Sequence, residues 1–220
     1  MKKVFAKINL MVALVALVAI GGIFVATAMV KAFADNKPVT ITATILETLT
    51  LACNNATIPN LTAGTPQSVQ ATCTVTTNGQ NGFNLKVNKT TVGNDATKTL
   101  KHSDGTTWIT DTGSGLAAFD GTTATPVLWG TAKGLGFRVG VVSTTPNANS
   151  LNPPAGYAMW GNDGATAEYA AFPVTAQTIY NYASYASAAS TISIEYKLDV
   201  PTTQKSGAYT GTVQYTATTN

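Results

Sequence analysis

The chain has 220 residues, and 10% of them are charged, against roughly a quarter in ordinary soluble domains. The formal net charge of +3 comes from four lysines before Asp35, and without these four the nine remaining basic residues face ten acidic ones, a net charge of −1. The rest of the chain therefore has no excess of basic side chains for phosphate contacts, which argues against nucleic acid as a partner.

The first 34 residues have the order of features found in secretory signal peptides. Lysines near the start make the N-terminal region positively charged, and an apolar run of 21 residues follows from Leu10 to Val30. Ala32-Phe33-Ala34 then forms a small-x-small cleavage site, with Asp35 after the cut. We therefore predict a signal peptide over residues 1–34 and a mature chain that is secreted or held at the cell surface.

The same apolar run is long enough to span a bilayer, which leaves an alternative to cleavage. If the leader is retained, it would anchor the chain in the membrane through residues 8–30, and no second apolar run predicts another membrane contact. In either case, residues 35–220 are expected to form a single domain outside the cytoplasm.

Cys53 and Cys73 are the only cysteines. Two cysteines in an exported chain indicate one disulfide, whereas structural zinc takes four ligands and is the weaker interpretation. Both cysteines fall on the apolar faces of predicted strands, so the bond is expected to join the first two strands inside the core. In the chain-entropy model, a closed loop of about 20 residues contributes ~3 kcal/mol of stability.

Alternation of apolar and polar residues with a period of two predicts a series of β-strands. The alternating segments are, in chain order, 39–45, 49–53, 69–75, 83–87, 135–141, 192–200 and 209–217. Each would have one buried and one solvated face, as strands of antiparallel sheets do. Asn-Gly pairs at 78–79 and 81–82 mark a turn. The pattern predicts an all-β fold, an antiparallel β-sandwich of the Ig-like or jelly-roll-like kind, after an N-terminal apolar signal helix.

The middle of the chain, from residue 88 to residue 190, has a less regular pattern. Asp104-Gly105, Asp120-Gly121 and Asp163-Gly164 predict turns. Residues 165–189 are rich in alanine and tyrosine and suggest a short helix.

No group of residues predicts catalysis, so we do not expect an enzyme. His102 is the only histidine, which excludes a three-histidine zinc site, and no G-x-S-x-G motif accompanies it. We interpret it as a loop residue between Lys101 and Gly105. The ten acids are scattered and suggest no pair for glycoside hydrolysis. The sequence predicts no catalytic residue, no metal and no cofactor, with a secreted hydrolase as the least favoured alternative.

Two other kinds of chemistry stay open. Four aspartates offer hard oxygen ligands of the kind that calcium prefers, although Asp before Gly mainly forms turns. They are Asp104, Asp111, Asp120 and Asp163. A Lys–Asn cross-link, as in some surface adhesins, would need a buried lysine, and the sequence does not show which lysine is buried.

The tryptophans form a candidate ligand platform. Trp108, Trp129 and Trp160 could stack on sugars, and three tyrosines within 180–185 could extend the surface. The alternative is that these large aromatic residues fill the core or cover its ends. The platform would make the chain a secreted carbohydrate-binding module, with cell-wall or host glycans as partners.

Two segments resemble a known kind of protein. The first runs from Thr40 to Cys53 and continues in 69–73, and the second is Leu198 to Thr216, which contains Gly-Ala-Tyr-Thr-Gly-Thr-Val at 207–213. Together they resemble the spore-coat-U and fimbrial-subunit type of secreted β-sandwich, in which an early cysteine pair joins the first two strands and a Gly-x-Tyr-Thr-x-Thr-Val strand closes the chain. The closing strand is also similar to that of WxL-type bacterial surface domains.

The resemblance implies an extracellular structural or adhesive surface protein, including a coat or filament subunit. Its expected partners are further copies of itself or other surface proteins. Because the first predicted strand begins at Val39, soon after Ala34, the sequence shows no separate extension that one copy could donate to the next.

Overall fold

The computed structural model describes residues 40–90, 97–111, 115–122, 125–143, 158–161, 165–186 and 188–220. The predicted signal peptide lies outside these ranges, as does the predicted turn at Asp163-Gly164. The chain divides into two units, Met1–Ile45 and Leu46–Asn220, and every described strand belongs to the second. No helix in the described ranges is long and apolar enough to cross a membrane.

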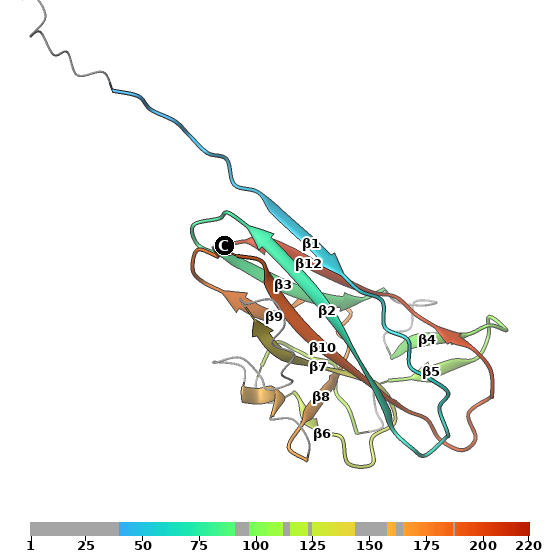
Figure 1. The fold of residues 1–220 in the computed structure, drawn as a ribbon. Helices are drawn as coiled ribbons and strands as arrows, with labels where there is room; N and C mark the ends of the chain where they lie inside the picture. The colour runs from blue at the N-terminus through green and yellow to red at the C-terminus, as the bar shows by residue number, and fades with distance from the viewer. Residues whose placement is uncertain are drawn as a thin grey trace, which may run out of the picture. The chain divides into compact units, whose positions relative to one another are not determined.

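The second unit is all-β, as predicted, and its strands pair antiparallel (Figure 1). The largest sheet has the order β1 (Leu49–Cys53), β2 (Gln67–Thr77), β10 (Ser190–Asp199), β7 (Gly134–Ser143), β8 (Glu168–Ala171) and β6 (Val127–Leu128). The second sheet has the order β12 (Val213–Thr219), β3 (Phe83–Lys89) and β9 (Gln177–Tyr182). The third has the order β11 (Tyr209–Thr210), β4 (Lys98–His102) and β5 (Trp108–Thr110). One short 3-10 helix, η1 (Ala158–Trp160), completes the described elements.

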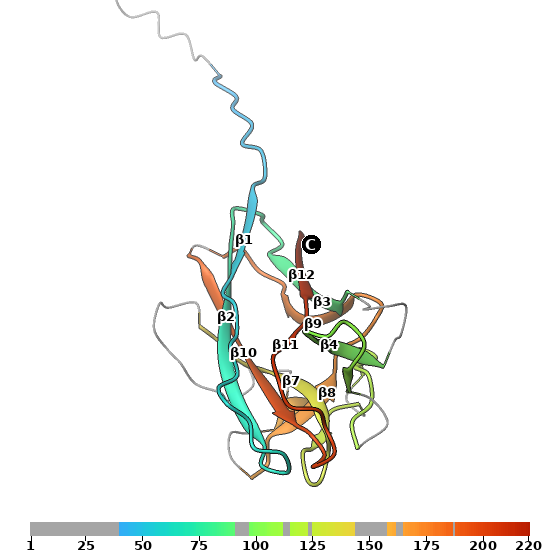
Figure 2. The same cartoon turned by 90° about the vertical axis from the view of Figure 1, so that its right-hand side faces the viewer.

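The largest sheet and the β12-β3-β9 sheet bury their apolar side chains in one shared core. Figure 2 shows β2 and β10 on one side of the unit and β12, β3 and β9 on the other. Val75 of β2 and Ile194 of β10 belong to the same buried cluster as Leu85 of β3, and all three are 0% exposed. Because alternate residues of a strand point to one face, each of these strands supplies several such side chains.

The predicted strand at 39–45 is wrong over its described part. Residues 40–45 form neither strand nor helix, and the side chains of Ile41 and Ile45 are 89% and 85% exposed. Alternation makes a strand only where a neighbouring strand supplies hydrogen bonds. The next segment, β1, has such a neighbour in β2, with Leu49 opposite Thr77 and Cys53 opposite Cys73.

The short helix suggested for 165–189 is also wrong. The described part of this stretch holds β8 and β9, which pair with β7 and β3. Tertiary pairing overrides the helix preference of alanine here, because Ala170 and Ala171 pair with β7 and are 0% exposed. The predicted closing strand is split: β11 pairs with β4 and β12 pairs with β3, with Gly211 between them.

The prediction that each strand has one buried and one solvated face fits β3 and β12, but it does not fit β10, which is buried on both faces. Ser193 and Glu195, on the predicted solvated face of β10, are 1% and 7% exposed. A second apolar cluster covers this face, and its members are Leu116, Trp129, Ala132, Ala167, Tyr169 and Ala171. Arg138 of β7 pairs with Glu195 beneath it, and the hydroxyl of Tyr169 donates to the same carboxylate. The sequence pattern did not predict this second layer.

The predicted turns at Asn81-Gly82, Asp104-Gly105 and Asp120-Gly121 are confirmed by glycines with positive φ. Gly82 has a φ of 79°, and a Cβ there would lie 1.9 Å from the carbonyl oxygen of Tyr182. Glycine is therefore required both by the backbone angle and by the close approach of the strand end.

Candidate functional site

The candidate site is the open edge of the second unit, which we define as the outer sides of β1 and β12. In the described part of the chain, β1 pairs only with β2, and β12 pairs only with β3. The two strands lie next to each other, yet no ladder joins them (Figure 1). Within the described ranges, each is thus an edge strand, the kind of strand to which a further strand can pair.

Apolar side chains at the open edge are less well covered than those in the middle of the sheets. Leu49 and Leu51 of β1, and Val213, Tyr215 and Ala217 of β12, are only partly buried although they pack on the core. An additional strand at this edge would remove further apolar area from water, at roughly 25 cal/mol per Å².

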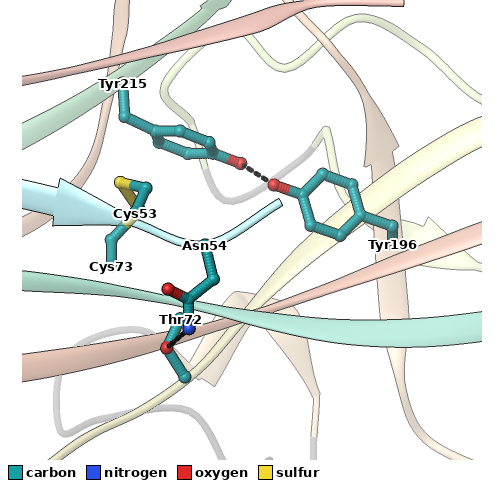
Figure 3. Close-up of a disulfide and its surroundings, with 6 residues drawn as sticks. All are labelled: Cys53, Asn54, Thr72, Cys73, Tyr196 and Tyr215. Carbon is teal, nitrogen blue, oxygen red and sulfur yellow. Dashed lines mark hydrogen bonds between the residues drawn. A yellow bond between two sulfur atoms is a disulfide. The ribbon is translucent and has the colours of Figure 1, made fainter. Parts of the chain in front are cut away.

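A disulfide fixes β1 at the open edge. Cys53 and Cys73 lie directly opposite each other in the two strands, are bonded, and close a loop with a sequence separation of 20 (Figure 3). This confirms the predicted pairing. Its expected place inside the core is only half right, because Cys73 is 1% exposed whereas Cys53 lies at the surface. Beside it, the side-chain amide of Asn54 donates to the hydroxyl of Thr72 at 3.2 Å.

Two tyrosines connect the sheets beneath the open edge. The hydroxyl oxygens of Tyr196 of β10 and Tyr215 of β12 lie 2.8 Å apart, and Figure 3 shows both rings near the disulfide. Burial raises the pKa of Tyr196, and burial together with the neighbouring Tyr196 hydroxyl raises the pKa of Tyr215 well above its ordinary value. Both hydroxyls therefore stay protonated through the neutral pH range, and the link persists there.

The segment Thr40–Ile45 carries the alternation that the sequence pattern took for a first strand. Ile41, Ala43 and Ile45 alternate with threonines, and all six residues are exposed. The side-chain amide of Asn78 donates to the carbonyl of Leu46 at 3.0 Å, and its oxygen accepts from the Thr48 backbone. These bonds fix the chain where it enters β1. The first described strand, β1, begins at Leu49 and not at Val39, so residues 40–48 precede it without forming a strand.

The three tryptophans lie in different surroundings. Trp160 is 0% exposed and packs against the rings of Phe119 and Phe137. Trp129 is 6% exposed and meets the ring of Tyr169 edge-on. Trp108 is partly exposed, with the Lys101 ammonium 4.7 Å from its ring centre. Of the three tryptophans, only Trp108 is thus partly exposed, and the Lys98 ammonium also lies over its ring, 6.0 Å from the centroid.

His102 is not the loop residue that the sequence suggested. It is the last residue of β4 and is 7% exposed. Its Nδ1 accepts from the backbone N–H of Asp104 at 3.0 Å, and its Nε2 lies 3.0 Å from the carbonyl of Ser206. The Lys205 ammonium, 2.8 Å from the Asp104 carboxylate, is the main cause that lowers the pKa of Asp104. These bonds hold the 103–107 turn against the segment before β11.

Of the aspartates considered for calcium, Asp163 lies outside the described residues, and Asp104, Asp111 and Asp120 each have other side-chain partners. Asp120 accepts from the hydroxyls of Thr122 and Thr125, which lowers its pKa to about 2. Asp111 is 0% exposed and pairs with Lys89. Across the described ranges, no three His, Cys, Asp or Glu side chains come together as a group that could hold a metal.

Sequence reasoning missed the buried Lys89–Asp111 pair, although a signal for it exists. Phe83, Leu85 and Val87 occupy the buried face of β3, and Lys89 is the next residue on that face. Asp111 likewise follows Ile109 with the same spacing of two. Continuing each apolar alternation by one position would have identified both charged residues as buried.

The open edge is thus the place where two sheets of the described fold end side by side. No protein-family model, no curated protein and no solved structure matches this chain.

Proposed function

We propose that the chain is an extracellular structural surface protein, a coat or filament subunit whose second unit is an Ig-like or jelly-roll-like β-sandwich. Copies assemble by strand addition: Thr40–Ile45 of one copy pairs with the outer side of β12 in the next. The observation that carries this proposal is the exposure of Ile41 and Ile45 at 89% and 85%. Isolated apolar side chains on a surface are ordinary, but a regular alternation of them outside any sheet is typical of a strand that lacks its partner.

The two segments match in length and pattern. Thr40–Ile45 offers three apolar side chains with a spacing of two, and the seven-residue β12 offers Val213, Tyr215 and Ala217 with the same spacing. On pairing, the isoleucines would cover the partly buried face of the neighbour and the threonines would face solvent, where β-branched polar residues suit a strand.

The expected gains from strand addition are similar in size to the cost of association. Fully burying an isoleucine side chain contributes roughly 1.5–3 kcal/mol. Backbone hydrogen bonds along an added strand contribute about 1 kcal/mol each. These gains oppose the cost of association and of ordering the donated segment, so the two isoleucines decide the balance.

The disulfide and the predicted leader support an extracellular place for this assembly. A Cys53–Cys73 bond persists in oxidising compartments, and it holds β1 in its sheet while β12 receives the new strand. A role in structure or adhesion, rather than catalysis, agrees with the absence of a catalytic motif in the sequence.

The test is sedimentation velocity, with negative-stain microscopy, on the full chain exported to an oxidising compartment. We expect polymers from the wild type and monomers from the double variant Ile41→Asp with Ile45→Asp. Thr42→Asp with Thr44→Asp is the matched control, because it adds the same charges to the other face and should still assemble. A wild type that stays monomeric at high concentration, or two double variants that assemble equally, would contradict the proposal.

A further inference from the structure

A lysine and an aspartate meet in the interior where three strands converge. Lys89 is the last residue of β3, and Asp111 directly follows β5. The Lys89 Nζ lies 2.9 Å from Oδ2 and 3.2 Å from Oδ1 of Asp111, and both side chains are 0% exposed. The hydroxyl of Thr99, on β4, donates to Oδ2.

This pair differs from the other lysine–aspartate pairs of the described chain. The Lys205 and Lys133 side chains that pair with Asp104 and Asp199 are 55% and 32% exposed, so water reaches them. Keeping an ammonium and a carboxylate charged in the interior has a high desolvation cost, because water no longer solvates either group. It is also the arrangement in which an amine and a carboxyl group are held together without competing solvent.

We propose that Lys89 and Asp111 condense to form an intramolecular isopeptide bond between Nζ and Cγ. The reactants need no outside reagent, because an amine and a carboxylic acid give an amide and one water molecule. The bond would be a covalent modification of the folded chain and does not depend on its assembly with other copies.

The steps balance within the three residues. A proton passes from the Lys89 ammonium to Oδ1 of Asp111, leaving a neutral amine and a carboxylic acid. Nζ attacks Cγ, and the carbonyl electrons move to Oδ2, where the Thr99 hydroxyl donates to the oxyanion. The nitrogen then passes a proton to Oδ1, the Cγ–Oδ1 bond breaks, and Oδ1 leaves as water while the Cγ–Oδ2 double bond forms again.

The surroundings favour this reaction. Burial is the largest influence on Asp111 and raises the pKa of its carboxyl group, which favours the acid form that attack requires. The backbone also holds both residues in place. The Lys89 N–H donates to the Pro173 carbonyl at 2.8 Å, and the Asp111 N–H donates to the Thr97 carbonyl at 2.8 Å. A Cβ at Gly134 would lie 2.6 Å from the Asp111 Cα, so the start of β7 packs directly against Asp111.

The bond would join Lys89, at the end of β3 in the β12-β3-β9 sheet, to Asp111, the residue directly after β5 of the β11-β4-β5 sheet. β3 also carries β12, the strand proposed to receive a neighbour. A pulling force on β12 would thus reach a covalent link that reducing agents cannot break, in contrast to the disulfide between β1 and β2.

The first test is the intact mass of the full chain after export and folding. We expect a mass lower by one water molecule than the sequence with its disulfide and its observed N-terminus requires. Lys89→Met should restore the full calculated mass, and Lys133→Met, which alters the more exposed pair, should keep the deficit. A wild type with the full calculated mass overturns the proposal, as does a deficit that persists in Lys89→Met.

The second test locates the bond. Trypsin cleaves after unmodified lysine, so an amide at Lys89 would leave residues 87–98 uncut and joined to residues 102–133. We expect this branched peptide, with fragments that place the link between Lys89 and Asp111. Separate peptides ending at Lys89 and Lys133 in stoichiometric yield would overturn the proposal.

A third measurement addresses the role of Thr99. Thr99→Val keeps the shape of the side chain but removes the donor to Oδ2, so the linked form should appear at least tenfold more slowly after refolding, followed by mass. An unchanged rate with Thr99→Val would remove the oxyanion role from Thr99. A wild-type sample is refolded in parallel. If it shows no mass deficit at any time, the proposed bond itself is overturned.

Discussion

Tyr196 and Tyr215 place their hydroxyl oxygens 2.8 Å apart and so connect a central strand of the largest sheet to the edge strand β12. The contact lies beneath the open edge, close to the disulfide (Figure 3). It gives the two sheets a polar link within a mainly apolar interface and sets the position of β12 relative to β10.

Removing the Tyr215 hydroxyl should weaken the domain measurably. Tyr215→Phe leaves the Tyr196 hydroxyl without its partner, and we expect the free energy of unfolding to fall by about 1–2 kcal/mol. Urea denaturation monitored by fluorescence measures this. Tyr185→Phe is the control, because Tyr185 is 58% exposed, and an equal loss in both variants would contradict the role of the pair.

The same tyrosines predict a loss of stability in alkali. Their folded pKa values are raised above the ordinary value of 10.0, so the folded state holds protons that the unfolded state releases. This contribution is fully present below about pH 10 and is lost as the pH rises from there through the raised values. Unfolding midpoints between pH 8 and 12 should therefore fall less in Tyr215→Phe than in the wild type. Parallel curves would contradict this.

Asp120 predicts a change at the acid end. The hydroxyls of Thr122 and Thr125 lower its pKa from 3.8 to about 2, so its contribution is present above pH 3.8 and is lost as the pH falls towards 2. We expect Asp120→Asn to be less stable than the wild type at pH 5, and the difference to shrink by pH 2. A constant difference across this range would show that Asp120 does not titrate as described.

Loss of the disulfide should loosen β1 more than the rest of the domain. In the chain-entropy model, a bond across about 20 residues contributes ~3 kcal/mol, and we expect a loss of that order in the double variant Cys53→Ser with Cys73→Ser. Hydrogen exchange should show its largest increase in Leu49–Cys53. Equal increases in β1 and in the central strand β10 would argue against a local effect.

A peptide should compete with the proposed strand addition. A synthetic peptide with the sequence of residues 39–46 is expected to slow polymer growth, because it occupies β12 without offering a further edge to the next copy. The control peptide replaces Ile41 and Ile45 with aspartate and should have no effect. Light scattering measures growth, and inhibition by both peptides alike would count against a specific strand site.

Several strands were predictable because the alternation of apolar and polar residues in the sequence coincides with the alternation of buried and less buried side chains in the fold. β2 and β3 alternate strictly, and each has one face in the shared core, so the sequence marks both the strand and its buried side. The cysteine pair was predictable as well, since the chain has only two cysteines. The segment 40–45 was misread because its alternation is equally regular. Among the described residues it has no neighbouring strand, whereas β1 pairs with β2.

Taken by itself, the amino-acid sequence determined the all-β class, the antiparallel strands and the Cys53–Cys73 pair, because period-two alternation and cysteine number are local properties. Tertiary structure alone decided which edges are open, which side of β10 is covered, and that Lys89 meets Asp111. These features depend on which strands become neighbours. Residues 22 positions apart, as Lys89 and Asp111 are, come together only when β3 and the segment after β5 pack against each other.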